Sequence, residues 1–451
     1  METVNTTDNH KVMKKYLTAI VALAVAVFPV AGQGQGSAPA AQADSIERLE
    51  LTLEEAQDYA VENNRSLQNA SLQVRQAYAA RWQTIATMLP QVNASLDYSD
   101  MCGYVMDLGA FPIAMPASGT IGITASIALS GSQIMGALLN NLSIEMNSIT
   151  EKKSESDLRN TTSYIYMSIL AIEETVGLLD NNLKNLQKLY EMTQHSVLVG
   201  VAEQTDADQI SVQVSGMENQ INTTKRSLEM LYNSLALQLG CGVEKEIVLT
   251  QTLDDLLDSE SMVSLLHTDF DLERNYDYQL LKKNTELSKK QITLAAMDYV
   301  PTLSAYYQYS AKKYFSDEMT MNMTPPNAIG VTLSVPIWSS GQRAAAITEK
   351  KLAYRAAQNT MDDTEDQLLV QDRQLRYNLA SSYENYTTQK KNIEVSQKVF
   401  DNISNKFEHG YASSLEVTNA STTLLTAQSN YIQALLEMVN SHIELKKLLN
   451  K

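Results

Sequence analysis

The sequence predicts a mixed α and β membrane protein, in which a long antiparallel helical coiled coil continues into part of a transmembrane β-barrel. Three observations lead to this prediction. Apolar residues alternate with a period of two in four segments, and they recur at spacings of three and four in four longer segments. The first half of the chain also resembles the second half, which indicates an internal duplication.

The N-terminal residues are expected to be a signal peptide with an N-terminal extension, covering residues 1–43. Met13-Lys14-Lys15 is followed by an apolar run from Tyr16 to Val30, as in secretory signals. Cleavage is expected after either Val30-Ala31-Gly32 or Ala41-Gln42-Ala43. Beyond this segment no apolar run reaches the roughly 18 residues of a spanning helix, so strands or an interfacial face must make any membrane contact.

The internal similarity has a period of roughly 210 residues, which is far longer than a solenoid repeat. Met88-Leu89-Pro90-Gln91 corresponds to Tyr299-Val300-Pro301-Thr302, and Ile121–Ser126 corresponds to Ile329–Ser334. We therefore expect two copies of one unit, at residues 44–255 and 256–451. Each copy consists of a helix, two strands and a long helical hairpin.

The four predicted strands have one apolar face and one small or polar face, and each is about ten residues long, as a tilted barrel strand requires. The apolar positions are Val92, Ala94, Leu96 and Tyr98; Ile121, Ile123, Ala125, Ile127 and Leu129; Leu303, Ala305, Tyr307 and Tyr309; and Ile329, Val331, Leu333, Val335 and Ile337.

The predicted helices carry the heptad spacing of coiled coils rather than the broader stripe of globular helices. The apolar positions of the first hairpin run from Ile165 to Tyr190 and from Ile210 to Leu235, and those of the second from Leu375 to Phe407 and from Leu424 to Leu448. Ser382, Gln389 and Ser396 interrupt the second seam and should weaken it. A helix from Gly131 to Gly200 would be roughly 100 Å long.

Four strands cannot close a barrel, because the smallest useful barrels need about eight. Two chains would give a barrel too narrow for an open pore. Three chains would give a twelve-stranded barrel and twelve helical rods, so we expect a homotrimer.

Composition and motifs argue against several other classes of protein. The net charge of −17 disfavours nucleic-acid binding. The five histidines and two cysteines lack ligand spacing, and no catalytic constellation is present, so no enzyme activity, metal or cofactor is expected. Met319-Thr320-Met321-Asn322-Met323 could ligate Cu(I), although a strand extending into a loop explains its alternation better.

The chain resembles the TolC family of outer-membrane efflux proteins over nearly its whole length. The resemblance is carried by Leu51-Thr52-Leu53-Glu54-Glu55-Ala56, by Asn63-Asn64-Arg65-Ser66-Leu67 and by Leu89-Pro90. It is most specific at two predicted helical turns, Gly200 to Asp206 and Gly410 to Leu424.

This resemblance implies an outer-membrane channel of a tripartite efflux system, which exports small molecules such as drugs and works with a periplasmic adaptor and an inner-membrane pump. It implies adaptor-docking tips at Gly200, Val201, Thr205, Gly410, Tyr411 and Ser414. It also implies a periplasmic aperture at Asp206, Glu416 and Asn419. Glu416 and Asn419 stand where relatives with acidic rings have two carboxylates, so one acidic ring is expected instead of two. Ala412 and Phe407 replace the basic residue and the tyrosine that hold such apertures closed.

Three alternatives remain open at this point. The duct could serve type I protein secretion, because the pump selects the cargo. A periplasmic coiled-coil scaffold would explain the heptads but not the strands. Glu416 could also be a solvated residue at a helix start, where carboxylates are favoured.

Overall fold

The computed structural model describes residues 48–102, 104–107, 112–114, 116–242, 245–256, 264–315 and 325–451. All of them belong to one compact unit, Glu47–Lys451. The expected signal segment and the Met319–Met323 loop lie outside the described residues.

Four strands form one antiparallel sheet, and the two halves of the chain contribute two strands each. The strands are β2 (Gln91–Ser99), β5 (Ser118–Leu129), β7 (Thr302–Tyr314) and β8 (Asn327–Ser334), and their order in the sheet is β2-β5-β7-β8. The β5–β7 pair, which joins the halves, runs from Ser118 opposite Tyr314 to Leu129 opposite Leu303. The four predicted strands are therefore confirmed, with β2 and β8 as the edges of this sheet.

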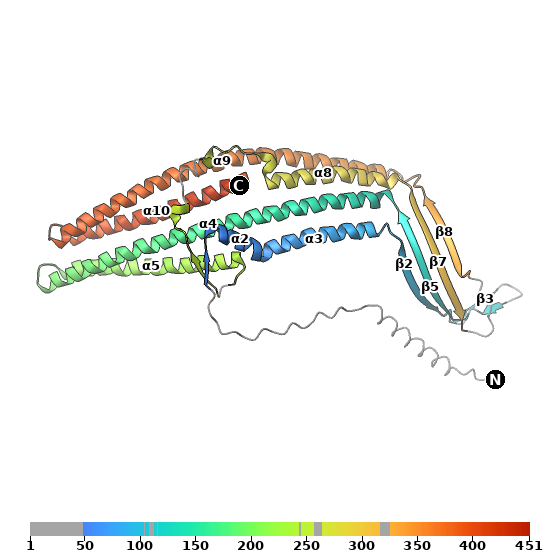
Figure 1. Ribbon diagram of the computed structural model, residues 1–451, viewed down its shortest axis with the longest axis horizontal. Coiled ribbons are helices and arrows are strands. Elements are labelled where there is room, and N and C mark those ends of the chain that lie inside the picture. The colour runs from blue at the N-terminus through green and yellow to red at the C-terminus, as the bar shows by residue number, and fades with distance from the viewer. Residues whose placement is uncertain are drawn as a thin grey trace, which may run out of the picture. The chain divides into compact units, whose positions relative to one another are not determined.

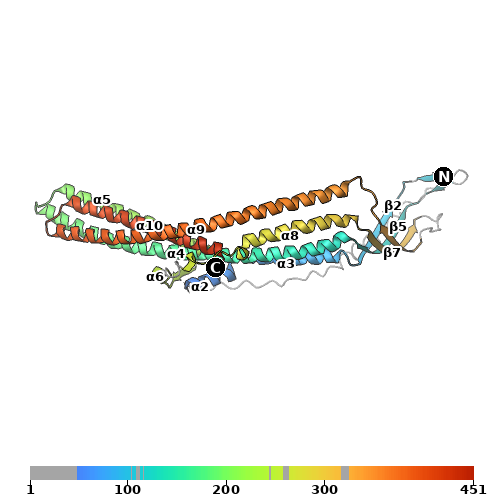
Figure 2. The same ribbon diagram turned by 90° about the horizontal axis from the view of Figure 1, so that it is seen from above.

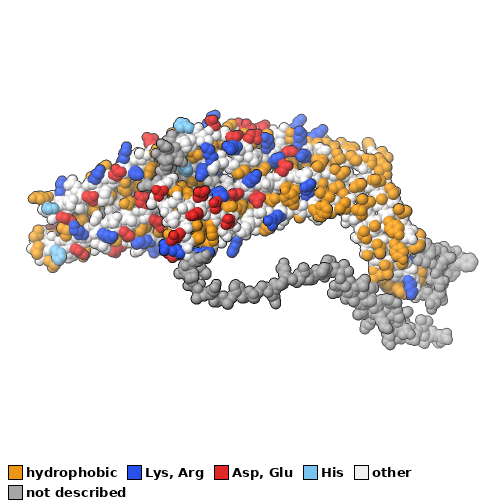
Figure 3. Space-filling view, in the orientation of Figure 1, with side chains coloured by type: hydrophobic (Ala, Val, Ile, Leu, Met, Phe, Trp, Pro, Cys, Tyr) orange, Lys and Arg blue, Asp and Glu red, His pale blue; other side chains and the backbone are white. Residues whose placement is uncertain are grey.

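The register gathers the predicted apolar positions on one face of the sheet. Ile123 lies opposite Ala94 on one side and Tyr309 on the other, and Tyr307 lies opposite Ile329. Val92, Ile123 and Val331 are all exposed, so this face is apolar and uncovered within the chain. Figure 3 shows hydrophobic side chains gathered over the sheet. An apolar patch of this kind marks a surface that contacts lipid or protein.

Strand β8 is shorter than the alternation predicts. The alternating pattern continues to Trp338, but the strand ends at Ser334. Pro336 has no backbone N–H to donate to a neighbouring strand, which explains the early end. The short antiparallel pair β3 (Val105–Asp107) and β4 (Pro112–Ala114), in the connection between β2 and β5, was not predicted.

Each half places its strands between a shorter helix and a long helical hairpin. The first half has α3 (Arg65–Ala86), α4 (Gly131–Leu198) and α5 (Gln204–Leu239), and the second has α8 (Tyr276–Ala296), α9 (Gln342–Glu408) and α10 (Ser414–Leu449). Helices α4 and α9 have 68 and 67 residues, so the predicted length of α4 is confirmed. The two hairpins lie side by side with their turns at the same end, away from the sheet (Figures 1 and 2).

The heptad positions lie in the helix interfaces as predicted. Leu179 and Leu186 of α4 belong to one buried cluster with Ile210 and Met217 of α5, and all eight predicted positions of α10 are buried. A buried polar pair also joins α4 to the other hairpin. The side-chain amide of Asn182 donates to Oε1 of Gln428 on α10 at 2.8 Å, and both residues are buried.

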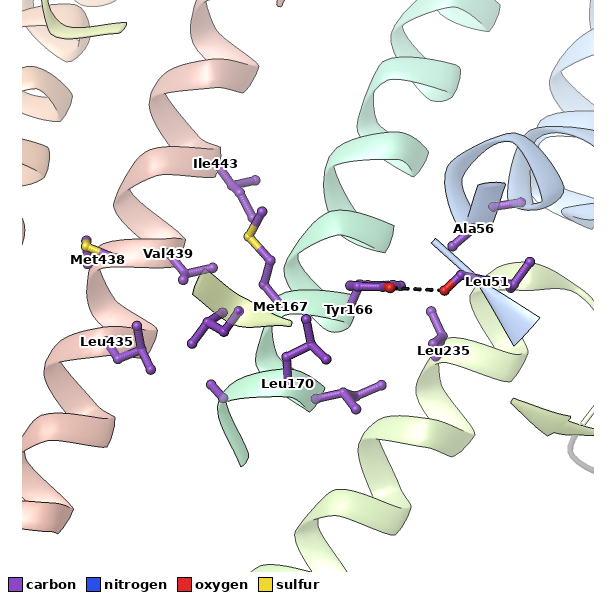
Figure 4. Packing of buried hydrophobic residues seen from close by; sticks show 14 of the residues in the cluster. Leu51, Ala56, Tyr166, Met167, Leu170, Leu235, Leu435, Met438, Val439 and Ile443 are labelled. Atoms are coloured by element: carbon purple, nitrogen blue, oxygen red, sulfur yellow. Dashed lines mark hydrogen bonds between the residues drawn. The ribbon is translucent and has the colours of Figure 1, made fainter. Parts of the chain in front are cut away.

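A small module covers the middle of the hairpins. Strands β1 (Arg48–Leu51) and β6 (Glu246–Leu249) pair in parallel, and α2 (Leu53–Asn63) and α6 (Leu253–Leu256) follow them. The fully buried Tyr166 of α4 donates its hydroxyl to the carbonyl of Leu51 at 3.0 Å (Figure 4). Short 3₁₀ helices, η1 (Leu272–Arg274) and η2 (Met297–Tyr299), flank α8.

Within the described ranges, none of the helices combines the length and the apolar character that crossing a bilayer requires.

Candidate functional site at the two helical turns

The two hairpins reverse through turns of the same design. Gly200 and Gly410 have φ values of +78° and +75°, in the left-handed region that glycine adopts without strain. The N–H of Val201 bonds to the carbonyl of Ser196, and the N–H of Tyr411 bonds to the carbonyl of Lys406. This six-to-one bond closes the last helical turn as in a Schellman motif. The predicted role of both glycines as turn residues is confirmed.

A capping box starts α10 and engages Glu416. The Oε2 atom of Glu416 accepts hydrogen bonds from the N–H of Ser413 at 2.7 Å and from its hydroxyl at 2.9 Å, and the N–H of Glu416 donates to Ser413 Oγ at 3.3 Å. The backbone N–H and the hydroxyl of Ser413 hold the pKa of Glu416 below its usual range. The carboxylate is exposed and charged, and it stabilises the start of its own helix.

The first turn contacts the second through Asp206. Oδ1 of Asp206, the third residue of α5, accepts a hydrogen bond from the hydroxyl of Ser414, the first residue of α10. Oδ2 accepts a bond from the N–H of Glu203 at 3.3 Å. Ser414 is buried, so its side chain joins the two turns and does not contribute to the exposed surface.

The tips beyond these contacts are apolar and exposed. Val201 and Tyr411 have exposed fractions of 81% and 83%, and they occupy equivalent places directly after Gly200 and Gly410. Leu198, Val199 and Leu415 are exposed beside them. Thr205 is also exposed, and its hydroxyl donates to Oε2 of Glu203 at 3.2 Å. Single exposed apolar residues are common, but a cluster at a turn indicates a contact surface.

Asn419 lies one helical turn after Glu416, and both side chains are exposed. Asn419 also lines a groove of about 650 Å³ between α9 and α10, together with uncharged polar residues such as Gln389, Asn392 and Ser396. This is the stretch where polar residues interrupt the predicted α9 seam, so looser packing there has a direct cause in the sequence.

Asp206 and Ser414 were predicted as separate site residues and not as a pair, and Ser413 and Glu203 were not predicted. The Ser-x-x-Glu spacing of Ser413 and Glu416 is the usual sign of a capping box and could have revealed the first of these. No spacing along the chain could have revealed the Asp206–Ser414 contact, because it joins the two halves.

Comparison with known proteins identifies the family of this chain. The family model described as outer membrane efflux protein matches residues 57–241 and 271–451. The chain belongs to the outer membrane efflux protein family. Its location is therefore the outer membrane, and it serves as an efflux channel of that membrane.

Curated relatives of this outer membrane efflux protein include the toluene efflux pump outer membrane protein TtgC and the antibiotic efflux pump outer membrane protein ArpC, both of Pseudomonas putida. Each is 22% identical over 414 residues, which cover 86% of this chain and 80% of the relative.

Solved channels share the fold. VceC of Vibrio cholerae matches with a TM-score of 0.70 and 14% identity, over 88% of this chain and 95% of VceC. MtrE of Neisseria gonorrhoeae, solved in an open state, matches with a TM-score of 0.71 and 16% identity, over 91% of this chain and 93% of MtrE.

Proposed function

We propose that this outer membrane efflux protein is a homotrimeric, passive export duct for small molecules such as drugs and toxic compounds. The observation that carries the proposal is the four-stranded sheet. In one chain its apolar face is exposed, and its edge strands β2 and β8 each pair with a described strand on one side only. Pairing β8 of each subunit with β2 of the next gives twelve strands in three chains, with the apolar face toward lipid. The relatives that are named as outer membrane proteins of toluene and antibiotic efflux pumps support small molecules as the cargo.

The same proposal gives the helices the role of a periplasmic tunnel. Helix α4 alone is about 100 Å long, enough to reach far into the periplasm. The matched element orders and lengths of the halves support an internal duplication at residues 44–255 and 256–451, which would bring three chains close to sixfold symmetry.

The turns are proposed as the docking site of a periplasmic adaptor, which an inner-membrane pump accompanies. Val201 and Tyr411 supply the apolar contact, Thr205 flanks it, and Gly200 and Gly410 set the chain direction. Ser414 supports the tip from inside. Asp206, Glu416 and Asn419 are proposed to surround the aperture, where three copies of Glu416 would form one ring of negative charge.

The test is single-channel conductance of the detergent-extracted chain in a planar bilayer, together with drug resistance of cells that express it with its pump. We expect a channel, and we expect the double variant Val201→Asp/Tyr411→Asp to keep the conductance and lose the resistance. No channel from an inserted trimer would refute the duct and favour a coiled-coil scaffold. If cells that express the chain export a protein but gain no drug resistance, the duct would instead serve type I protein secretion.

A further inference from the structure

A pocket in the middle of the helical region has a charge opposite to that of the chain. Its volume is about 310 Å³, and it lies between α4, α2, the start of α8 and the end of α10. Its lining includes Lys152, Arg159 and Asn160 of α4, Lys446 of α10 and Lys451. Glu155 is the only acidic side chain among the described lining residues. Four cationic side chains around one acidic side chain are unexpected in a chain with a net charge of −17.

Neighbouring carboxylates neutralise only part of this positive charge. Asp157 pairs with Lys447 at 3.0 Å, and Asp277 pairs with Lys153. Within the described part of the chain, Lys152 and Lys446 form no ion pair with any carboxylate. Arg159 pairs with Asp58 at 2.7 Å and with Glu155 at 3.2 Å, through its Nη1 and Nε atoms. Its second terminal nitrogen keeps N–H groups for another acceptor.

Asn160 adds a neutral hydrogen-bonding group whose side chain forms no hydrogen bond with another described residue. Only 6% of this residue is exposed, and it lines the pocket. Among the described residues its side-chain amide has no hydrogen-bond partner, whereas the amide of Gln57 beside it donates to Ser163 Oγ at 2.6 Å. Polar side-chain groups that are almost buried are usually hydrogen-bonded to protein or to ordered water, and an amide that faces a pocket can exchange such a water for a ligand. The amide of Asn160 is therefore available to a ligand in the pocket.

We propose that this pocket binds a phosphate group, held by the ammonium groups of Lys152 and Lys446, the guanidinium of Arg159 and the amide of Asn160. A phosphate offers several strong acceptor oxygens and a double negative charge, which match this set of donors. The volume leaves room for an organic substituent, so inorganic phosphate and a phosphomonoester both fit. The ligand would join α4 of the first half to α10 of the second, and binding should stabilise their packing.

The test measures the thermal unfolding midpoint and the calorimetric affinity of the full chain in detergent, with inorganic phosphate, glycerol 3-phosphate or chloride at one ionic strength. We expect phosphate to bind and to raise the midpoint, whereas chloride should do neither. Tighter binding of glycerol 3-phosphate would identify an organic phosphate as the natural class, and equal or weaker binding would identify free phosphate.

Substitutions of the pocket residues test whether they hold the phosphate. Lys152→Gln/Lys446→Gln should weaken phosphate binding at least about tenfold, because each charge-assisted contact is worth roughly that factor. Asn160→Asp keeps the shape of the side chain but adds a like charge, so it should abolish binding. Lys184→Gln, an exposed lysine on the same helix outside the pocket, is the matched control. Unchanged affinity in the double lysine variant, or equal effects of phosphate and chloride on the wild type, would overturn the proposal.

Discussion

The carboxylate of Asp206 on α5 accepts a hydrogen bond from the hydroxyl of Ser414 on α10, and so the turns of the two hairpins are joined within one chain. This bond joins the two halves of the chain, and its two residues are 208 positions apart in the sequence. Because it involves an ionised acceptor and a buried donor, it should resist separation of the two tips.

Separate removal of the two partners should loosen the tips. We expect Asp206→Asn and Ser414→Ala each to raise single-channel conductance and to cost about 1.5–3 kcal/mol of unfolding free energy. The double variant should cost less than the sum, because both changes remove one interaction. Asp208→Asn, which alters an exposed carboxylate of the same helix, should leave conductance unchanged. If the double variant costs as much unfolding free energy as the two single variants together, Asp206 and Ser414 do not stabilise each other.

Glu416 has a role in the helix cap and a proposed role as a charge in the aperture ring, and the two roles can be tested separately. Glu416→Gln keeps an acceptor for Ser413 but removes the charge, whereas Glu416→Ala removes both. If three carboxylates form a ring, both variants should reduce cation selectivity in bilayer recordings. Only Glu416→Ala and Ser413→Ala should also lower helix stability, because both remove the capping box. Unchanged selectivity in Glu416→Gln would leave this residue with the cap alone.

The amide pair Asn182–Gln428 should be sensitive to the loss of one partner. Gln428→Leu leaves the buried amide of Asn182 without its acceptor and should cost about 1–3 kcal/mol, measured by thermal unfolding. The double variant Asn182→Leu/Gln428→Leu should recover much of that loss, since two apolar side chains can pack where two amides met. A double variant worse than either single one would argue that these positions require polar groups.

His442 on α10 should make the stability of the helical region depend on pH. Its Nδ1 atom is buried without a partner among the described residues, and burial, with a smaller effect of Lys446, lowers its pKa to about 4. The unfolded chain, with a histidine pKa near 6.5, therefore takes up a proton before the folded chain does. The resulting stability is complete above about pH 6.5 and is lost as the pH falls through 4, in total about 3 kcal/mol.

His442→Leu should flatten this part of the profile of unfolding midpoint against pH. His409→Gln, at the exposed second turn, provides the control for the loss of a histidine. A wild-type midpoint that stays constant between pH 7 and pH 4 would contradict the prediction.

Periodicity was sufficient to predict the strands and the long helices. Two-residue alternation predicted a strand from Gln91, and the distance from Gly131 to Gly200 predicted α4, because both patterns act over many residues. The predicted end of β8 was wrong, because the alternation depends on side chains and takes no account of the missing backbone N–H of Pro336. The β1–β6 pair was missed, since short parallel strands 198 residues apart have no local signal.

The positions of the two turns could be predicted from the sequence, but the Asp206–Ser414 contact between them could not. Glycine and the flanking motifs located both reversals, and Val201 and Tyr411 are exposed there. The buried pair Asn182–Gln428 was not anticipated, because heptad spacing is defined by apolar positions and gives no signal for polar residues that are buried in pairs.

The order of the strands bears on which compartment the helices occupy. Strand β2 leaves the helical end after α3 and β8 returns to that end before α9, so the two free edges run in opposite directions. If β8 of one copy pairs with β2 of the next, the antiparallel pattern continues and every copy keeps its helices on one side of the membrane. Antiparallel pairing of β2 with a second β2 would turn one copy over, and the two helical regions would then project into different compartments. We therefore expect head-to-tail contact around a closed ring, in which the orientation of the first inserted copy fixes that of the others.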